Sequence, residues 1–529
     1  MGDCRMDGPD TPFIKSAEEM GGRFQAELMM ALPGWKKRLQ GNPDCLVEIE
    51  QDVHQAFACG ADLLVSGLIA MVMKTAEFAA AAEQLRQNAA LPLSGGRERQ
   101  IRVRLLGGLI LWITSLYCAP RKRWFGRTQE QTPGMYVELA QFGFGKGCTP
   151  GLQSRVARQA ALCPSLQFAQ QELERSGVKL DVKAVGRISK QCGEGLLQLR
   201  TQELQLWREG KLPAGRELAG KRVSVQIDGG RTRIRGKMRD AAVVPETVNA
   251  DGVVCEDGPG RSRKRPSKTF DADWREPKLL TIFVHDERGR MEKKSQALVD
   301  GTFQGPDAVA ELVAMHLHRL GAAQALSVTF VADGGVWIWE RIGAIVELAK
   351  LTDVPIYQVL DCYHATHHIS LALAALGLPE SIRMPLYREQ RTLLRNGQWR
   401  EVVDELWALA EDAADDSQVW TEIAYLEKHG EAKRLMYPTF RGKGLPLGSG
   451  AIESTIRRVV NLRLKGNAIY WNEDTAEAML QTRAYVLTDR WDDRLCELRQ
   501  LRSRDGRTAW RWTPQDMTSK VERTAPSSA

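Results

Sequence analysis

The chain has little of what would place it in a membrane or mark it for export. Aromatic residues make up only 7% of its 529 residues. The longest apolar runs, residues 63–73 and 105–114, are well short of the ~20 apolar residues that a membrane helix needs. The first residues include Asp3, Asp7 and Asp10 and lack the basic start and apolar core of a secretory signal. The sequence therefore predicts a soluble, cytoplasmic protein with no membrane partner.

Paired cysteines and a strong charge excess are also missing. The ten cysteines are scattered without a C-x-x-C pair, so neither a disulfide framework nor a zinc ribbon is indicated, and we expect reduced, mostly buried thiols. The 73 basic and 66 acidic residues leave a net charge of +7, which fits an anionic partner without establishing one. At roughly 150 residues per domain, the length suggests about three domains.

The first part of the chain is predicted to be mainly helical. Apolar residues recur at helical spacing across residues 11–87, and residues 100–104 and 110–117 are typical of short strands. The next segment predicts three short helices, with Gly177 as a left-handed turn before the last: residues 152–162, 165–176 and 181–191.

These three helices have the outline of a helix-turn-helix. The third helix would present three cations to a DNA groove: Lys183, Arg187 and Lys190. Short helices around a glycine are also common in domains that do not bind DNA, so both interpretations stay open.

A basic strand is predicted soon after Lys221. Residues 222–228 read as a strand that ends at Asp228, and residues 231–239 then carry a cation at every second position. The period of a strand places these cations on one face: Arg231, Arg233, Arg235, Lys237 and Arg239. We interpret them as contacts to a phosphate backbone, with a solvated sheet face as the alternative. Residues 240–275 are interpreted as a basic loop whose role is open.

Further strands and helices alternate after this loop. The predicted strands are residues 279–285, 325–332 and 354–360, and the predicted helices between them are residues 306–320 and 336–351. The order is therefore three strands, helix, strand, helix, strand. Helical spacing returns over residues 370–437, and a final long helix is expected to begin near Ala451.

Three acids in this series suit metal-assisted phosphoryl transfer. Asp228 and Asp333 end predicted strands, and Glu453 lies on the helix after the sheet. Magnesium prefers oxygen ligands and needs few carboxylates, and two such ions can stabilise the attacking and leaving oxygens of an in-line displacement. Each acid also has a structural interpretation, because Asp-Gly is a common turn signal and a glutamate in a first helical turn is favoured by the helix dipole.

Several ordered motifs carry a family resemblance. They are VQIDGGR (residues 225–231), VADGGVWIW (331–339), LDCYHATHH (360–368), and LPLGSGAIESTIRRVVNLRLKG (445–466) followed by AIYW (468–471). In this order they resemble bacterial insertion-sequence DDE transposases of the ISKra type, relatives of the Mutator-like group. The resemblance extends over residues 221–491. It implies a ribonuclease H-like catalytic domain, a mixed five-stranded sheet with helices, interrupted by an all-helical insertion before Glu453.

The resemblance also implies cofactors and partners. Asp228, Asp333 and Glu453 would hold two Mg²⁺ ions, for which Mn²⁺ can substitute, with Asp228 bridging both. The partners would be double-stranded DNA, as transposon ends and target DNA, and a second copy in a synaptic homodimer. A bacterial, nucleoid-associated location in the cytoplasm follows. Relatives often carry a cysteine pair near Cys118, but Arg121 stands at the second position here, so whether the N-terminal region binds zinc is open.

The motifs suggest roles for further residues. Asp361 and His364 resemble an acid-x-x-His element, in which Asp361 is a supporting residue and His364 contacts the scissile phosphate or an acidic ligand. The segment after Glu453 offers DNA-binding cations: Arg457, Arg458, Arg463 and Lys465. Arg457 shares a helical face with Glu453. Trp471 is interpreted as stacking on an unpaired base, with core packing as the alternative.

The sequence thus predicts a DDE transposase that binds terminal inverted repeats and catalyses Mg²⁺-dependent cleavage and strand transfer. A ribonuclease H-like nuclease without strand transfer and a non-catalytic DNA-binding protein are the alternatives. The predicted regions are helical (residues 1–95), a mixed linker (96–148), a helix-turn-helix region (149–215), the first part of the catalytic core (216–369), the helical insertion (370–445), the end of the core (446–500) and a flexible tail (501–529).

Overall fold

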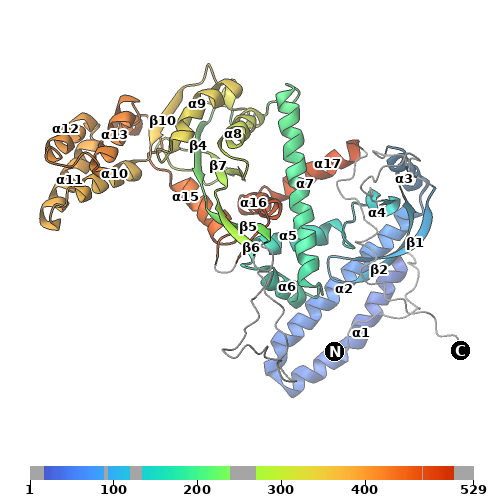
Figure 1. Cartoon of the computed structure of the whole chain (residues 1–529). Helices are drawn as coiled ribbons and strands as arrows, with labels where there is room; N and C mark the ends of the chain where they lie inside the picture. Colours follow the sequence, from blue (N-terminus) through green and yellow to red (C-terminus); the bar gives the residue numbers. More distant parts are fainter. Residues whose placement is uncertain are drawn as a thin grey trace, which may run out of the picture. The chain divides into compact units, whose positions relative to one another are not determined.

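The chain folds into two compact units. Unit 1 comprises Met1–Gly210 and Gln481–Ala529, and unit 2 comprises Lys211–Leu480. Figure 1 colours the elements along the sequence. The computed structural model describes residues 17–88, 93, 95–119, 134–238, 270–466 and 469–505.

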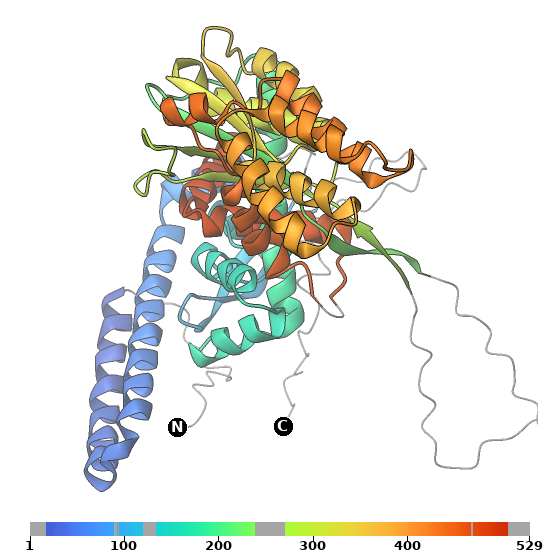
Figure 2. The same cartoon turned by 90° about the vertical axis from the view of Figure 1, so that its left-hand side faces the viewer.

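Unit 1 begins with helices and a small sheet, as the sequence predicts. Helices α1 and α2 form an antiparallel hairpin (Figures 1 and 2), which α3 follows. Strand β2 pairs antiparallel with both β1 and β3. The bounds are α1 Ala17–Gly41, η1 Pro43–Cys45, α2 Leu46–Met73, α3 Ala76–Gln87, β1 Arg97–Arg104, β2 Ile110–Cys118, β3 Met135–Tyr136 and α4 Val137–Gln141.

Helix α2 is longer and more apolar than its short apolar run suggests. The stretch Pro43–Met73 is long and apolar enough to cross a membrane by length and composition, whereas the sequence prediction counted only residues 63–73. One such helix is weak evidence for a membrane span, because core helices pass the same test. The buried Asp62 carboxylate accepts hydrogen bonds of 3.0 Å from the backbone N–H groups of Gly107 and Leu109, so α2 is fastened to the β1–β2 turn.

Three helices of unit 1 occupy the predicted helix-turn-helix segment: α5 (Pro150–Leu162), α6 (Leu166–Arg175) and α7 (Val182–Arg208). Asp181 caps α7 by accepting a hydrogen bond from the Ala184 N–H, and Gly177 has a φ of 81°. Helix α7 is 27 residues long, far longer than the predicted residues 181–191. The short recognition helix of the prediction is therefore wrong in length, because buried residues recur along α7 as far as Glu203.

Unit 2 contains a mixed five-stranded sheet in the order β10-β9-β4-β7-β8. Strands β4, β7 and β8 are antiparallel neighbours, and β9 and β10 run parallel to β4. This confirms the predicted α/β core with a mixed five-stranded sheet. The bounds are β4 Arg222–Gly229, β7 Lys278–Val284, β8 Leu298–Thr302, α8 Pro306–Leu320, η2 Ala322–Gln324, β9 Ser327–Ala332, α9 Val336–Leu348 and β10 Ile356–Leu360.

The strand assignment differs from the prediction at two places. The basic strand β5 (Thr232–Met238) lies outside the main sheet and pairs with β6 (Phe270–Arg275) in a separate hairpin. The third strand of the main sheet is β8, which the sequence prediction missed. Residues 270–275 of the predicted basic loop form β6, and residues 240–269 lie outside the described residues.

Helices follow β10, as predicted, but the helix that carries Glu453 is short. Helix α15 (Gly450–Ile456) continues as a π-helical segment, η3 (Arg457–Asn461), so the expected long helix from Ala451 is wrong. The insertion helices, which Figure 2 shows in orange, begin directly after β10. The remaining bounds are α10 Cys362–Ala375, α11 Glu380–Arg395, α12 Trp399–Leu409, α13 Gln418–Glu431, α14 Tyr437–Gly442, α16 Glu473–Leu487 and α17 Trp491–Asp505.

Candidate functional site

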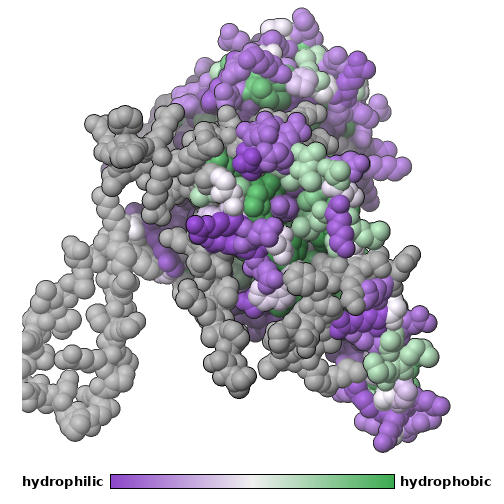
Figure 3. Space-filling model, turned by 90° about the vertical axis from the view of Figure 1, so that its right-hand side faces the viewer, coloured by the Kyte–Doolittle hydropathy of each residue, from purple (hydrophilic) through white to green (hydrophobic). Residues whose placement is uncertain are grey.

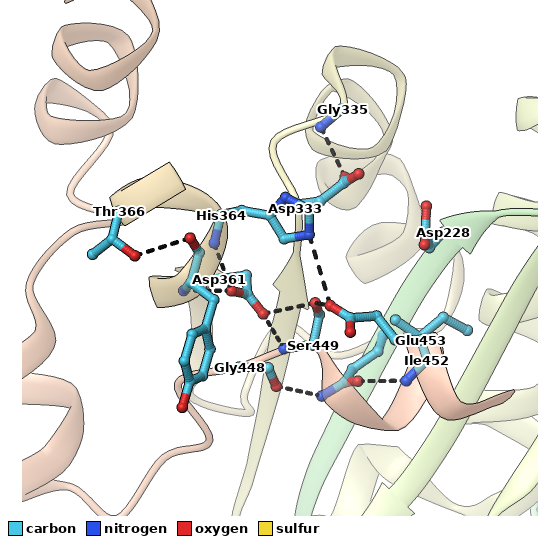
Figure 4. Close-up of polar contacts among 12 residues, drawn as sticks. Asp228, Asp333, Gly335, Asp361, His364, Thr366, Gly448, Ser449, Ile452 and Glu453 are labelled. Atoms are coloured by element: carbon cyan, nitrogen blue, oxygen red, sulfur yellow. Dashed lines mark hydrogen bonds and ion pairs between the residues drawn. The ribbon is translucent and has the colours of Figure 1, made fainter. Parts of the chain in front are cut away.

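Two of the predicted acids lie at the ends of neighbouring strands. Asp228 is near the end of β4, and Asp333 directly follows β9. Because β4 and β9 pair in parallel, both carboxylates reach the same edge of the sheet, as Figure 4 shows. The apolar runs that bury these strands therefore also fix the backbone positions of both acids.

Burial and like charge perturb the Asp228 carboxyl group. Its partial burial, and then the negative charge of Asp333, raise the pKa of Asp228 to about 6, against opposing effects of the Gly229 N–H and the charge of His364. The Asp228 carboxylate accepts a hydrogen bond of 2.6 Å from the Gly229 N–H. The arrangement therefore places a partly buried carboxyl group beside a second acid whose negative charge disfavours its ionisation.

A tyrosine from the helical insertion holds the turn after Asp333. The Tyr425 hydroxyl on α13 donates a hydrogen bond of 3.0 Å to the backbone carbonyl of Asp333. A Cβ atom at Gly334 would lie 2.1 Å from that hydroxyl, and Gly334 has a φ of 98°, so glycine is required here. The Tyr425 ring stacks on His368 with 3.6 Å between ring centroids. The insertion thus contacts the backbone of a candidate catalytic acid.

Asp361 connects two segments that are far apart in the sequence. Its side chain is 1% exposed and caps α10 by accepting hydrogen bonds from the N–H groups of Tyr363 (2.6 Å) and His364 (2.9 Å). The same carboxylate accepts from the backbone N–H of Ser449 and, at 2.7 Å, from the Ser449 hydroxyl. It therefore fixes the start of α10 against the start of α15, while the supporting role in catalysis that the sequence suggests stays a prediction.

Glu453 and His364 meet at this junction. The His364 Nε2 atom lies 3.7 Å from Glu453 Oε1, and the Ser449 hydroxyl lies 3.3 Å from the same oxygen. Both side chains are exposed in part, and Figure 4 shows His364 between Asp333 and Glu453. The predicted contact between His364 and an acidic residue is present. Arg457 is exposed, and the described residues include no ion pair between it and Glu453.

One residue of this site was missed by sequence reasoning. Gln226 stands two positions before Asp228 on β4, where its side-chain amide donates to the Gly448 carbonyl at 3.1 Å and accepts from the Ile452 N–H at 3.0 Å. Gln226 therefore joins β4 directly to α15. The only available signal was a polar residue inside an apolar strand.

The Asp228 and Asp333 pair suits a hard divalent cation. Carboxylate oxygens are the ligands that Mg²⁺ and Mn²⁺ prefer. Burial and the charge of Asp333 raise the pKa of Asp228, and a cation between the two acids would offset both effects. Across the residues that the structure describes, no three His, Cys, Asp or Glu side chains are grouped closely enough to hold a metal. The residues that fit a divalent cation are therefore Asp228 and Asp333, because the Glu453 side chain is directed to His364.

The predicted DNA-binding cations of unit 2 divide by exposure. Arg231, directly before β5, and Arg235, on β5, are exposed, and Arg233 on β5 is half-buried. The side chain of Lys237 lies outside the described residues, as does Arg239. After Glu453 the exposed cations are Arg457, Arg458 and Lys465, whereas Arg463 is buried.

Trp471 packs inside unit 2. It is 9% exposed, and the guanidinium carbon of Arg463 lies 5.0 Å from its ring centroid. Its backbone N–H donates to the Arg233 carbonyl at 3.2 Å, and its carbonyl accepts from the Arg235 N–H at 2.8 Å. This burial favours core packing over stacking on an unpaired base.

The remaining predicted cations lie near the start of α7 in unit 1. Arg187 is exposed, and Lys190 pairs with Glu194 at 3.4 Å.

Comparisons of the chain with models of known protein families, with curated proteins and with solved structures find no match. Function must therefore be argued from the motifs and the site geometry.

Proposed function

We propose that the chain is a DDE transposase that binds the terminal inverted repeats of an insertion sequence and catalyses metal-dependent DNA cleavage and strand transfer. The observation that carries the proposal is the pair Asp228 and Asp333 at the ends of adjacent parallel strands, where burial and then the negative charge of Asp333 raise the pKa of Asp228 to about 6. Two mutually repelling carboxylates at a rigid sheet edge are characteristic of functional sites rather than of stable packing.

The strand order supports a ribonuclease H-like fold for unit 2. Three antiparallel strands lie on one side of the sheet, with β4 innermost, and two parallel strands follow on the other side. The acids sit at the first and fourth of these strands in chain order, Asp228 on β4 and Asp333 after β9. The insertion helices then separate β10 from Glu453, as the family resemblance implies.

In this proposal each side chain has a defined task. Asp228 and Asp333 hold the divalent cations, and Glu453 completes the set when its side chain turns from His364. The ions supply charge stabilisation for the attacking and leaving oxygens. His364, released from Glu453, donates a hydrogen bond to a phosphate oxygen. Asp361 and Gln226 keep α10 and α15 in place on the sheet edge, which maintains the geometry for in-line attack.

Double-stranded DNA, as element end and target, is the proposed partner. The exposed Arg231, Arg235, Arg457 and Arg458 offer phosphate contacts beside the acids, and Arg187 with Lys190 offers them in the helix-turn-helix interpretation of α5 to α7. Each phosphate contact releases counterions, so binding of an element end is expected to weaken steeply with rising salt. We place this activity in the bacterial cytoplasm at the nucleoid.

We also propose a homodimer, which synapsis of two element ends requires. The exposed face of α2 supports it, because apolar side chains recur there at the spacing of a helix-pairing seam: Phe57, Leu64, Leu68 and Met71. Figure 3 shows apolar side chains (green) among polar ones on the α1–α2 hairpin at the lower right. Light scattering should give a dimer for the native chain and a monomer for Leu68→Glu. A native monomer at micromolar concentration would contradict the proposal.

Loss of one metal ligand is the direct test. A labelled element end, a supercoiled plasmid and Mg²⁺ are incubated with the native chain, with Asp333→Asn and with the exposed control Asp353→Asn. The native chain and the control should yield covalent joint molecules, and Asp333→Asn should yield none while still binding the end. Cleavage without joint molecules would indicate the nuclease, and binding without cleavage by the native chain would indicate a non-catalytic protein.

A further inference from the structure

An exposed tryptophan on the β5–β6 hairpin is surrounded by cations. Trp274 on β6 is 46% exposed. The guanidinium carbons of Arg233 and Arg231 lie 4.9 Å and 5.7 Å from its ring centroid, and the Lys465 ammonium nitrogen lies 5.9 Å from it. We call these four residues the Trp274 patch. It joins the β5–β6 hairpin to a residue that follows Trp274 by 191 positions in the sequence.

The positive charge of the Trp274 patch is not balanced by acids within the described residues. Among the described residues, no ion pair joins a carboxylate to Arg231, Arg233 or Lys465. The neighbouring Arg275, in contrast, pairs with Glu473 at 3.4 Å. Three like charges around one ring repel each other, and attraction to an exposed ring is weak compensation. The charge arrangement therefore favours an anionic ligand.

The patch is held rigidly and close to the candidate acids. Arg231 follows Asp228 by three residues, so their Cα atoms lie at most ~11 Å apart along an extended chain. The Thr232 hydroxyl donates to the Leu464 carbonyl at 2.8 Å, which fastens β5 to the segment that carries Lys465. A strand of nucleic acid with its phosphate at Asp228 would therefore pass the Trp274 patch within a few nucleotides.

We propose that the Trp274 patch binds unpaired nucleotides of single-stranded DNA, with one base stacked on the Trp274 ring and the adjoining phosphates beside Arg231, Arg233 and Lys465. In a duplex the base faces are already stacked, so the exposed indole would contribute nothing, whereas a single strand offers both a base face and phosphates. The position of this strand at a cleavage site rests on the proposed function, but binding of the strand does not.

The experiment measures binding of the full-length chain to fluorescent single-stranded oligo-dT and to a blunt duplex of equal length, by anisotropy in EDTA. Trp274→Ala should weaken binding of the single strand about 10-fold, because stacking contributes strongly for each base, and should change duplex binding less than 2-fold. Trp274→Phe should retain most of the single-strand affinity. Trp407→Ala, an exposed tryptophan on α12, is the matched control and should bind like the native chain.

Three outcomes overturn the inference: equal single-strand binding by Trp274→Ala and the native chain, an equal loss on both DNAs, or the same loss in Trp407→Ala. Circular dichroism of each variant detects any loss of folding. If Trp274→Ala does not fold, binding of the single strand by Trp274→Phe is the deciding measurement. Since the assay contains no metal, its result is distinct from that of the strand-transfer test. If the native chain yields joint molecules and Trp274→Ala binds the single strand as tightly as the native chain, the proposal for the Trp274 patch is wrong. The transposase proposal is then unaffected.

Discussion

Replacing the Asp361 carboxylate by an amide should loosen the junction that positions Glu453. In Asp361→Asn one side-chain oxygen still accepts from the Tyr363 and His364 N–H groups. The amide nitrogen, however, faces the Ser449 N–H and hydroxyl, which both donate to Asp361 in the native chain. The Ser449 N–H and hydroxyl would then face an amide nitrogen, which is also a donor, in a buried site. The start of α15 should therefore separate from α10 far more often.

The magnitude follows from the two hydrogen bonds that are lost. Bonds to a charged, buried acceptor contribute roughly 1.5–3 kcal/mol each, so the local free energy of opening should fall by about 3 kcal/mol. That energy corresponds to roughly a 150-fold change in the opening equilibrium. Ser449→Ala, the matched control, loses only the hydroxyl bond of 2.7 Å and the weaker contact to Glu453. It should cost about 1.5 kcal/mol, or roughly 12-fold.

Amide hydrogen exchange read by mass spectrometry reports this opening directly. The peptide that contains the Ser449 amide should exchange about 100-fold faster in Asp361→Asn than in the native chain, while peptides of unit 1 remain unchanged. The reasoning is refuted if the variant and the native chain exchange within 3-fold of each other. It is also refuted if Ser449→Ala accelerates exchange as much as Asp361→Asn does.

Three more predictions concern single side chains. The folded pKa of Asp228, about 6, lies above its ordinary value of 3.8, so the folded metal-free protein binds this proton more tightly and its stability falls as pH rises from about 4 to 6. Asp228→Asn should remove that fall and raise the free energy of unfolding in EDTA at pH 8 by about 3 kcal/mol; an unchanged pH dependence in urea titrations would contradict this. Tyr425→Phe should lower thermal stability by about 1 kcal/mol, since it removes the bond to the backbone after β9. Asp62→Ala leaves the buried Gly107 N–H and the partly buried Leu109 N–H unpaired and should cost about 2–4 kcal/mol in urea unfolding, whereas the exposed Asp44→Ala should cost less than about 0.5 kcal/mol.

Four strands of the main sheet in unit 2 could be predicted from local patterning. Strands β7 and β9 are buried along their whole length and appear as nearly continuous apolar runs, whereas β4 alternates apolar and polar residues and β10 is a short run rich in β-branched and aromatic residues. Strand β8 escaped because its five residues include Asp300 and Gly301, which indicate a turn. In the fold Asp300 is buried and contacts His316 on α8 at 2.7 Å, and a partner from a later helix is not visible in a local pattern.

The acids of the site could be predicted, but not the contacts that position them. Asp228 and Asp333 can be recognised in the sequence because each stands at the end of a predicted strand. The contacts of Asp361 with Ser449, and of Gln226 with the start of α15, join residues far apart in the sequence, and nothing local specifies them. The basic strand was placed in the wrong sheet because alternation fixes which side chains share a face and does not identify the partner strand.

The helical insertion determines when the site can be completed during synthesis. About 120 residues separate Asp333 from Glu453, and translation at roughly 5–20 residues per second adds them in on the order of 10 s. A growing chain therefore has its first two acids, and all of the sequence of α5 to α7, before Glu453 exists. A product that ends inside the insertion would contain Asp228, Asp333 and every residue of the Trp274 patch except Lys465. It would also lack Glu453. Under the proposed function, such a product would compete with the full chain for DNA without being able to complete the acid set.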